Sequence, residues 1–512
     1  MKAHMMDFIH LGITAFLHGQ NSKVLLSGLL GPLFLAFCLL QWKRSRSSSP
    51  NLPIVGDPKA ADFRSALEEG AQKYPNSPFI LPTPMHPTVI LPHSAIDAIK
   101  NLPENVVSLR QHHYTIFVGA YTHFGKSADE LDTAIRIDLT RNVEKNLQLF
   151  QDEIPYAFQQ NIGECKTWTP ILGYKKMLRI VSLLSSRAFV GLPLSRNEEW
   201  IQTTCQYAID GAAGAHALTP YPTILRPLVA PFLLRSLKRH RNLARTMMQP
   251  LVKKFATAES NGINPTEDEN TAGGDLIQYL LTHYKGPVTA DRLARDQLIA
   301  TFVAMHTTTI CLTQAVFDLA ARPEYIQPLR DELEEALRSD GHQDGQLHNT
   351  TMIRLRKLDS FIRESQRMNP PGLVTMLRHV TAPDGLKLES GHVIPQGAVV
   401  GISNHMVTKS FPDADQFDGF RFSNLRDQAG HEIRHQLVTT GLDSLSFGHG
   451  NHACPGRFFA ANEIKVILAH MLQNFNIKLK DGEGRPANHH RGAIVSPPGN
   501  AEVFLRRRVL SC

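Results

Sequence analysis

FGHGNHACPG, residues 447–456, places Cys454 in a glycine-rich loop directly before a helical run over residues 457–473. A thiol at a helix N-terminus lies at the positive end of the helix dipole, which lowers its pKa and suits the thiolate to bind a metal. Phe447 can pack against the face that the loop presents. Three glycines of the loop allow conformations and close approaches that a Cβ would block: Gly448, Gly450 and Gly456. The loop is therefore expected to lie flat against a large planar ligand.

Three other interpretations of this loop compete. An isolated cysteine is most often a small buried hydrophobic residue. His449, His452 and Cys454 are zinc-ligand types, but a structural zinc site needs a fourth ligand and usually a second pair at recognisable spacing. A glycine pattern, a helical run and Asp481 imitate a dinucleotide-binding unit. Asp481, however, follows Ala453 later than the roughly 20 residues expected of such units, so this interpretation is disfavoured.

The loop matches every fixed position of Phe-x-x-Gly-x-x-x-Cys-x-Gly and so resembles the haem-binding loop of the cytochrome P-450 family. The resemblance implies that Cys454 is the axial thiolate ligand of the iron of haem b, iron protoporphyrin IX. His452 stands where many members carry an arginine for a haem propionate, and Arg378 and Arg136 are candidate substitutes by their position in the family. The other residues that the resemblance places against the cofactor are Phe447, Gly448, Gly450 and Gly456.

The longest helical segment covers residues 290–321, with Thr289 as its predicted N-cap and Arg322-Pro323 as its stop. At 1.5 Å per residue, this helix is roughly 48 Å long. Residues 298–319 are apolar on most faces, so we expect the helix to be buried.

Residues 304–309 of that helix, Ala-Met-His-Thr-Thr-Thr, resemble the family's Ala/Gly-Gly-x-Asp/Glu-Thr-Thr/Ser. The resemblance makes Thr308 the threonine that hydrogen-bonds dioxygen and helps deliver protons, and we predict Thr308 and Thr307 as catalytic. Thr307 replaces the usual acid and Met305 a small residue, so protons are expected to arrive through water, His306 or the substrate. The other interpretation of Thr308 is a buried helical threonine bonded only to its own i−4 carbonyl.

Glu364 and Arg367 stand three apart in a helical run and share a face, a spacing that stabilises an exposed helix by only about 0.2–0.5 kcal/mol. The pair resembles the family's Glu-x-x-Arg, which meets an arginine of a later segment, here Arg421 within residues 417–422. Gly419 replaces the proline usual in that segment. The resemblance predicts a buried structural network of Glu364, Arg367 and Arg421 on the proximal side of the haem.

Residues 24–42 form an uncharged apolar run, within the roughly 17–25 residues that span a bilayer, and basic residues follow at 43–46. The basic cluster predicts a cytosolic C-terminal side, and it argues against a cleaved signal peptide because it follows the apolar run. We therefore predict a lumenal segment (1–23), a transmembrane anchor (24–42), a basic and proline-containing tether (43–53) and one haem-binding monooxygenase domain (54–512).

Composition agrees with a large folded enzyme. The 512 residues are 42% hydrophobic, and the six cysteines are scattered without a paired framework, which indicates a reducing compartment. The net charge of +7 lacks the interleaved aromatics and recognisable module of a nucleic-acid binder, so no nucleic-acid partner is expected. Strand patterns at 88–92, 373–380, 393–402 and 494–507 within a mostly helical chain predict a mainly α fold with minor β. The resemblance implies the cytochrome P-450 fold, with a long helix over the haem, small sheets and an N-terminal transmembrane helix.

From this resemblance the chain is identified as a microsomal haem-thiolate monooxygenase. It implies O2, electrons from NADPH-cytochrome P-450 reductase, a lipophilic substrate, and a single-pass anchor in the endoplasmic reticulum membrane with a cytosolic catalytic domain. The motifs are similar to those of filamentous-fungal members that tailor secondary metabolites, often terpenoids. Other interpretations are a reductase-independent isomerase or dehydratase, a polyketide or alkaloid substrate, or a non-enzymatic haem or zinc protein. By analogy the substrate pocket includes Tyr114, Phe117, Phe302, Ala304, Met305, Leu373, Val374 and Val495.

Overall fold

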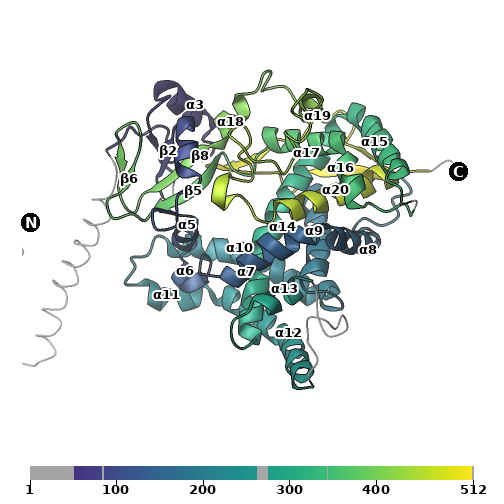
Figure 1. Cartoon of the computed structure of the whole chain (residues 1–512), viewed down its shortest axis with the longest axis horizontal. Coiled ribbons are helices and arrows are strands. Elements are labelled where there is room, and N and C mark those ends of the chain that lie inside the picture. Colours follow the sequence, from purple (N-terminus) through teal and green to yellow (C-terminus); the bar gives the residue numbers. More distant parts are fainter. Residues whose placement is uncertain (1–50, 84–85, 262–274, 343, 510–512) are drawn as a thin grey trace, which may run out of the picture.

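The computed structural model describes residues 51–83, 86–261, 275–342 and 344–509, and shows a mainly helical molecule with small sheets (Figure 1). The mainly α prediction is confirmed. The predicted lumenal segment, the anchor at 24–42 and most of the tether lie outside the described residues.

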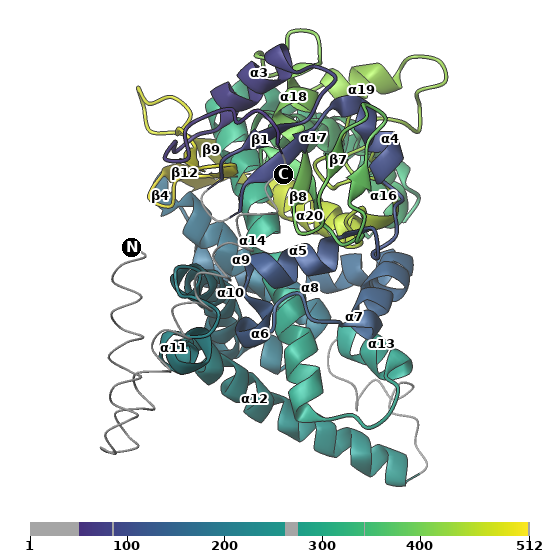
Figure 2. The same cartoon turned by 90° about the vertical axis from the view of Figure 1, so that its left-hand side faces the viewer.

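Helix α14 (Ala290–Ala321) passes through the middle of the molecule, from the helical half to the half that contains the sheets (Figure 2). It begins where predicted, because the Thr289 hydroxyl accepts a hydrogen bond from the Arg292 N–H, and it ends before Arg322. Within the described part of the chain, this helix is long and apolar enough to cross a membrane, but most of its apolar stretch is buried inside the protein. It is therefore the core helix. Five helices pack against it: α9 (Gly173–Phe189), α10 (Glu198–Leu218), α12 (Arg235–Ser260), α17 (Arg356–Met368) and α20 (Arg457–Asn474).

The larger sheet has the strand order β1-β2-β8-β5-β3. Strands β2 and β8 are parallel, and the other pairs are antiparallel. The pairing of β5 with β8 shifts register between Thr375 and Arg378, where Met376 has a left-handed φ of 51°. Such a bulge re-aims the side chains that follow it. The strands are β1 (Phe79–Leu81), β2 (Thr88–Leu91), β3 (Val107–Ser108), β5 (Val374–Val380) and β8 (Val399–Ser403).

A second sheet, β4-β12-β9, is antiparallel throughout, and two of its strands, β9 and β12, follow α20 in the chain. Its members are β4 (Thr169–Leu172), β9 (Phe475–Lys478) and β12 (Glu502–Arg507), and the hairpins β6–β7 (Leu386–Lys387, Val393–Ile394) and β10–β11 (His489–Arg491, Ile494–Ser496) stand apart. A dinucleotide-binding unit needs parallel strands on either side of its helix. The antiparallel partner of β9 therefore excludes that interpretation of the 448–481 segment.

Two helical segments are not single regular α-helices. Residues 349–368 form α16 (Asn349–Arg354) and α17, because Leu355 leaves the helical region with ψ 62°. Arg136 lies in a π-helix over Ala134–Leu139. The remaining helices of the described residues are α3 (Arg64–Lys73), α4 (Ile96–Ile99), α5 (Leu109–Ile116), α6 (Gly119–Thr122), α7 (Asp129–Thr133), α8 (Val143–Asn161), α11 (Arg226–Leu233), α13 (Asp275–His283), α15 (Ile326–Ser339), α18 (Asn404–Lys409) and α19 (Arg421–Arg426), with short 3₁₀ turns between them.

Candidate active site

The Cys454 loop is fixed by backbone hydrogen bonds. The Cys454 N–H donates to the Phe447 carbonyl at 2.7 Å, and the Gly448 N–H donates to the Leu445 carbonyl at 2.8 Å. Gly448 and Gly450 have left-handed φ values of 67° and 77°. A Cβ on Gly450 would also lie 2.3 Å from the Lys100 carbonyl oxygen, so that position requires glycine.

Burial raises the pKa of the Cys454 thiol, against the sequence expectation of a lowered value. The N–H groups of Gly456 and Arg457 and the charge of Arg457 act in the expected direction, but desolvation outweighs them. A bound metal ion reverses this balance, because a coordinated thiol is deprotonated. In this loop, burial therefore favours the thiol form of Cys454, and a bound cation would favour the thiolate.

Two observations around Cys454 fit a flat ligand that carries carboxylates. A Cβ built on Gly456 meets no described atom within 4 Å, so the loop leaves room beside the cysteine. Arg378 is buried, and burial lowers its pKa to about 10, yet its one hydrogen bond to the described residues runs from Nη1 to its neighbour's carbonyl, on Leu377. A buried guanidinium without a carboxylate partner favours an anion close by. The haem and its propionates fit both features.

Polar residues that the sequence did not single out lie beside Arg378. Burial, and then the charge of Arg378, lower the pKa of both His113 and His452. Glu104 accepts a hydrogen bond from the Ser108 hydroxyl, and its Oε1 lies 3.6 Å from Nδ1 of His452. Among the predicted residues, Arg136 contributes a weaker effect on the pKa of His452. No local motif marks His113 or Glu104, because only the fold brings residues 104–113 next to the cysteine loop.

The three consecutive threonines of α14 differ in their hydrogen bonds. Thr307 and Thr309 each donate to their own i−4 carbonyl, on Val303 at 2.8 Å and on Met305 at 2.7 Å. Thr308 is a buried residue, and its hydroxyl has no hydrogen-bond partner within the described ranges. The back-bonded interpretation thus describes its two neighbours and not Thr308. The helix remains continuous across all three residues.

Open space borders the middle of this helix. Val303 is 48% exposed and Thr307 is exposed, although most of α14 is buried. Cys311 follows on the same face, and burial, with a smaller effect of Cys454, raises its pKa to about 11. The stripe formed by Val303, Thr307 and Cys311 therefore runs toward the cysteine loop.

The residues predicted to line the pocket divide into two groups. Phe117 and Phe302 make an edge contact at 5.3 Å between ring centroids, and Phe124 stacks on Phe302 at 4.3 Å. Ala304 packs partly buried against the same cluster, Met305 is fully buried, and Tyr114 lies against Gly119 and Gly125. A separate buried apolar cluster, which also contains Phe63, holds Leu373, Val374 and Val495.

Glu364, Arg367 and Arg421 meet in one buried network. Arg367 donates two hydrogen bonds to Glu364, at 2.7 and 2.8 Å, and Arg421 donates one at 3.3 Å. The Asp418 N–H also donates to this carboxylate, at 3.0 Å. The spare N–H groups of Arg367 bond backbone carbonyls in the 408–416 segment, including those of Thr408 and Ala414. One carboxylate thereby connects α17 to the segment that leads into α19.

Comparisons with known proteins agree with this geometry. The cytochrome P450 family model matches residues 200–505. The chain is 41% identical to cytochrome P450 monooxygenase ataF of Aspergillus terreus over 94% of its length and 97% of that protein. It is 40% identical to BOA7 of Botryotinia fuckeliana and to gliF of Aspergillus fumigatus, both cytochrome P450 monooxygenases, over 94% of its length and 96% of theirs.

Among solved structures, the cyanobacterial CYP120A1 with bound retinoic acid has the same fold, with a TM-score of 0.64 and 16% identity over 90% of this chain and 99% of that one. The chain belongs to the cytochrome P450 family. It is a monooxygenase, and membership implies a haem-thiolate cofactor, O2 and a redox partner.

Cys454→Ala should abolish the red-shifted Soret band of the reduced, CO-bound protein, because that band reports a thiolate ligand. Cys205→Ala and Cys311→Ala serve as controls and should keep it. An unchanged spectrum in Cys454→Ala would show that another residue binds the iron.

Glu364→Gln should lower the free energy of unfolding by about 3–5 kcal/mol, because Arg367 and Arg421 would be left as buried charges without a counter-charge. Urea unfolding followed by tryptophan fluorescence measures the change. Glu335→Gln, in an exposed pair with Arg338, is the matched control and should leave the midpoint nearly unchanged. Equal midpoints for the two variants would contradict a buried network.

Proposed function

We propose that this protein is a membrane-anchored monooxygenase that binds haem b through Cys454 and oxidises a lipophilic small molecule, of terpenoid type, in fungal secondary metabolism. The observation that carries the proposal is the pairing of a partly buried cysteine just before α20 with a threonine in α14 whose hydroxyl is free of its own helix. The same proposal includes NADPH-cytochrome P450 reductase as the electron donor.

Bound haem would supply the activation of O2 and the insertion of one oxygen atom into a C–H bond, chemistry that belongs to the cofactor. The chain supplies its setting. Cys454 would provide the thiolate, and Arg378 would provide a positive charge for the propionates. His113, whose pKa is lowered by burial and by Arg378, would provide a neutral N–H donor. Thr308 would offer a hydroxyl, and thus a movable proton, that is not bonded to its own helix. The back-bonded Thr307 hydroxyl is committed to the Val303 carbonyl and is the weaker of the two predicted proton donors.

The lipophilic substrate is supported by aromatic side chains that pack against α14. Phe117, Phe124 and Phe302 form one cluster, in which Phe302 belongs to α14 and precedes the exposed Val303. Apolar walls with few polar groups bind apolar ligands and set their orientation by shape. The terpenoid class rests on the resemblance of the motifs to fungal members alone. Mass spectrometry of extracts from an expressing strain and a deletion strain would identify the substrate.

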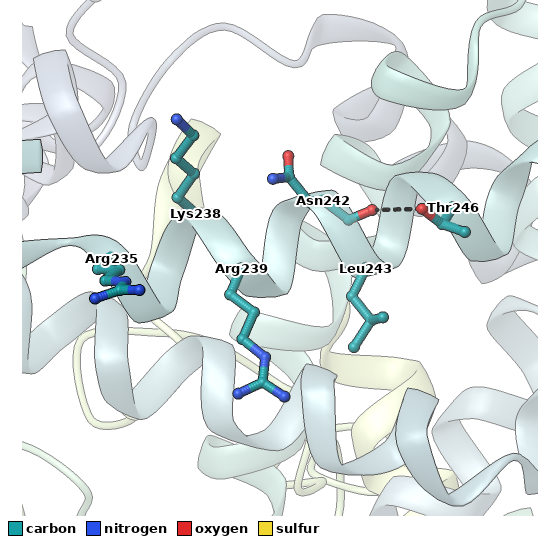
Figure 3. Close-up of a pocket in the computed structure, with 6 residues that line it drawn as sticks. All are labelled: Arg235, Lys238, Arg239, Asn242, Leu243 and Thr246. Carbon is teal, nitrogen blue, oxygen red and sulfur yellow. Dashed lines mark hydrogen bonds between the residues drawn. The ribbon is translucent and has the colours of Figure 1, made fainter.

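The membrane part of the proposal has support outside the N-terminal segment. Helix α11 exposes Leu228 by 68% and Phe232 by 81%, and α12 begins directly after it with basic residues. Figure 3 shows the basic side chains of Arg235, Lys238 and Arg239 extending from α12 in different directions. These residues line a shallow surface depression of about 390 Å³. Apolar side chains beside basic ones suit the boundary between acyl chains and anionic headgroups. In Figure 1 α11 lies toward the same side of the molecule as β2, near the start of the described chain.

Thr308→Ala should preserve the CO spectrum but divert electrons to peroxide, because the positioned proton is lost. Positioned proton transfer contributes about 10²–10⁴-fold, so we expect product per NADPH to fall by roughly tenfold or more. NADPH consumption, peroxide and product are measured together. Thr301→Ala is the control, since Thr301 is a buried threonine of the same helix bonded to the Gln297 carbonyl. Unchanged coupling in Thr308→Ala would make its role structural.

Deleting residues 1–42 should weaken membrane association and leave the CO spectrum intact. Adding Leu228→Glu and Phe232→Glu should remove most of the remaining association, because charges on α11 would have to enter the bilayer boundary. Sedimentation with vesicles that contain anionic lipid measures both steps. Ile433→Glu is a matched control, because Ile433 is as exposed as Phe232, at 81%. If Ile433→Glu released the protein equally, α11 would not be the contact.

A further inference from the structure

His306 stands two residues before Thr308 in α14, and its ring is held by two other helices. The Tyr174 hydroxyl of α9 lies 3.2 Å from Nδ1, and the Cys205 carbonyl oxygen of α10 lies 3.2 Å from Nε2. Successive residues of an α-helix are rotated by about 100°, so side chains two residues apart point to nearly opposite sides. His306 therefore faces α9 and α10 while Thr308 faces away from them.

The partners of His306 fix where each proton lies. A carbonyl oxygen can only accept, so Nε2 carries the hydrogen and donates it to Cys205. Nδ1 of the neutral ring is then an acceptor, and the Tyr174 hydroxyl must donate to it. Burial lowers the pKa of His306 and raises that of Tyr174, which keeps the ring neutral and the phenol protonated. Both ring nitrogens are occupied, so this arrangement leaves His306 no free position for carrying protons to the substrate side.

The same contact continues between α9 and α10. The Ser182 hydroxyl donates to the Leu178 carbonyl at 2.6 Å, so at 3.1 Å from Ser182 the Cys205 thiol is the donor. A chain of oriented hydrogen bonds thus connects α9, α10 and α14 at the level of Thr308. Such directional contacts set position in a way that apolar packing does not.

Helix α14 is held by polar contacts on either side of this stretch. Asp296 accepts a hydrogen bond from the Tyr284 hydroxyl, and Asp318 accepts hydrogen bonds from Ser365 and Arg485. Between them, His306 bonds α9 and α10 directly. Thr307 and Thr309 are aimed by bonds to their own helix, but the Thr308 hydroxyl has no such bond within the described ranges. The direction of Thr308 therefore depends on how the helix backbone is rotated.

We propose that His306, held by Tyr174 and the Cys205 carbonyl, is a positioning residue that fixes the rotation of α14 and so aims the Thr308 hydroxyl into the active site. This inference rests on the proposed role of Thr308 and goes beyond it. His306 is a substitute neither for the missing acid nor for Thr307. It acts on catalysis only through Thr308.

The test uses carbon monoxide bound to the reduced full-length holoenzyme. The infrared stretching band of the bound carbon monoxide shifts when polar groups near it move. Tyr174→Phe removes one hydroxyl and keeps the ring, so it preserves the fold even if His306→Leu does not. Thr308→Ala defines the band without the hydroxyl. We expect Tyr174→Phe and His306→Leu to shift or split the band toward the Thr308→Ala position, and to cause no further shift when combined with Thr308→Ala. Gln202→Ala, on the exposed face of α10, should have the wild-type band.

Product per NADPH provides the second measurement. Tyr174→Phe should lower it by less than Thr308→Ala does, and the double variant should equal Thr308→Ala, the non-additivity expected of residues that act through one group. A wild-type band in both Tyr174→Phe and His306→Leu, or an equal shift in the Thr308→Ala background, would overturn the inference. If the reduced, CO-bound wild-type protein lacked the thiolate Soret band, the proposed function would be overturned instead. Failure of the inference and failure of the proposed function are therefore distinguishable.

Discussion

Helix α14 is apolar on most of its faces, so other parts of the chain must pack around most of its surface to keep it from water. This constraint determines how the rest of the molecule is arranged. Five helices pack against it, and the sheets lie beyond them at one end (Figures 1 and 2). Leu298, Leu312 and Phe317 are fully buried as a result. Burial of apolar surface at roughly 25 cal/mol per Å² is the main stabilising contribution available to such an arrangement. The cover opens at Val303 and Thr307, which are exposed.

The buried polar groups around α14 fix the relative positions of the helices more than they contribute to the stability of the fold. Asp318 in α14 accepts hydrogen bonds from Arg485 at 2.6 Å and from Ser365 of α17 at 2.6 Å. Glu364 does the same for Arg367 and Arg421. Replacing a buried ion pair with apolar residues is often neutral or stabilising, so such networks are better explained by the geometry that they enforce. Together with His306 they hold the middle of α14, its C-terminal half and the segment before α19 in fixed relation.

Features with a local physical cause could be predicted from the sequence. The ends of α14 follow from the Thr289 cap and from Arg322-Pro323, and α20 begins after the glycine-rich loop at Arg457, as expected. Features that depend on distant contacts could not. The neighbours of Arg378 come from residues 104–113, and the raised pKa of Cys454 comes from burial by the surrounding fold. Phe302 and Val495, both predicted to line the pocket, pack in separate apolar clusters of the fold.

The close approach of Gly450 to Lys100 has a consequence for engineering. The Lys100 carbonyl oxygen lies where a Cβ of residue 450 would be and also accepts the Asn451 N–H at 3.2 Å, so the cysteine loop and the turn after α4 share one boundary. An insertion in that turn, although it is distant in sequence, would displace the cysteine itself. The turn at Gly482 and Gly484 is different, because a Cβ at either position meets no described atom within 4 Å. Labels and fused domains belong at this second turn, where the backbone can lengthen without moving the metal ligand.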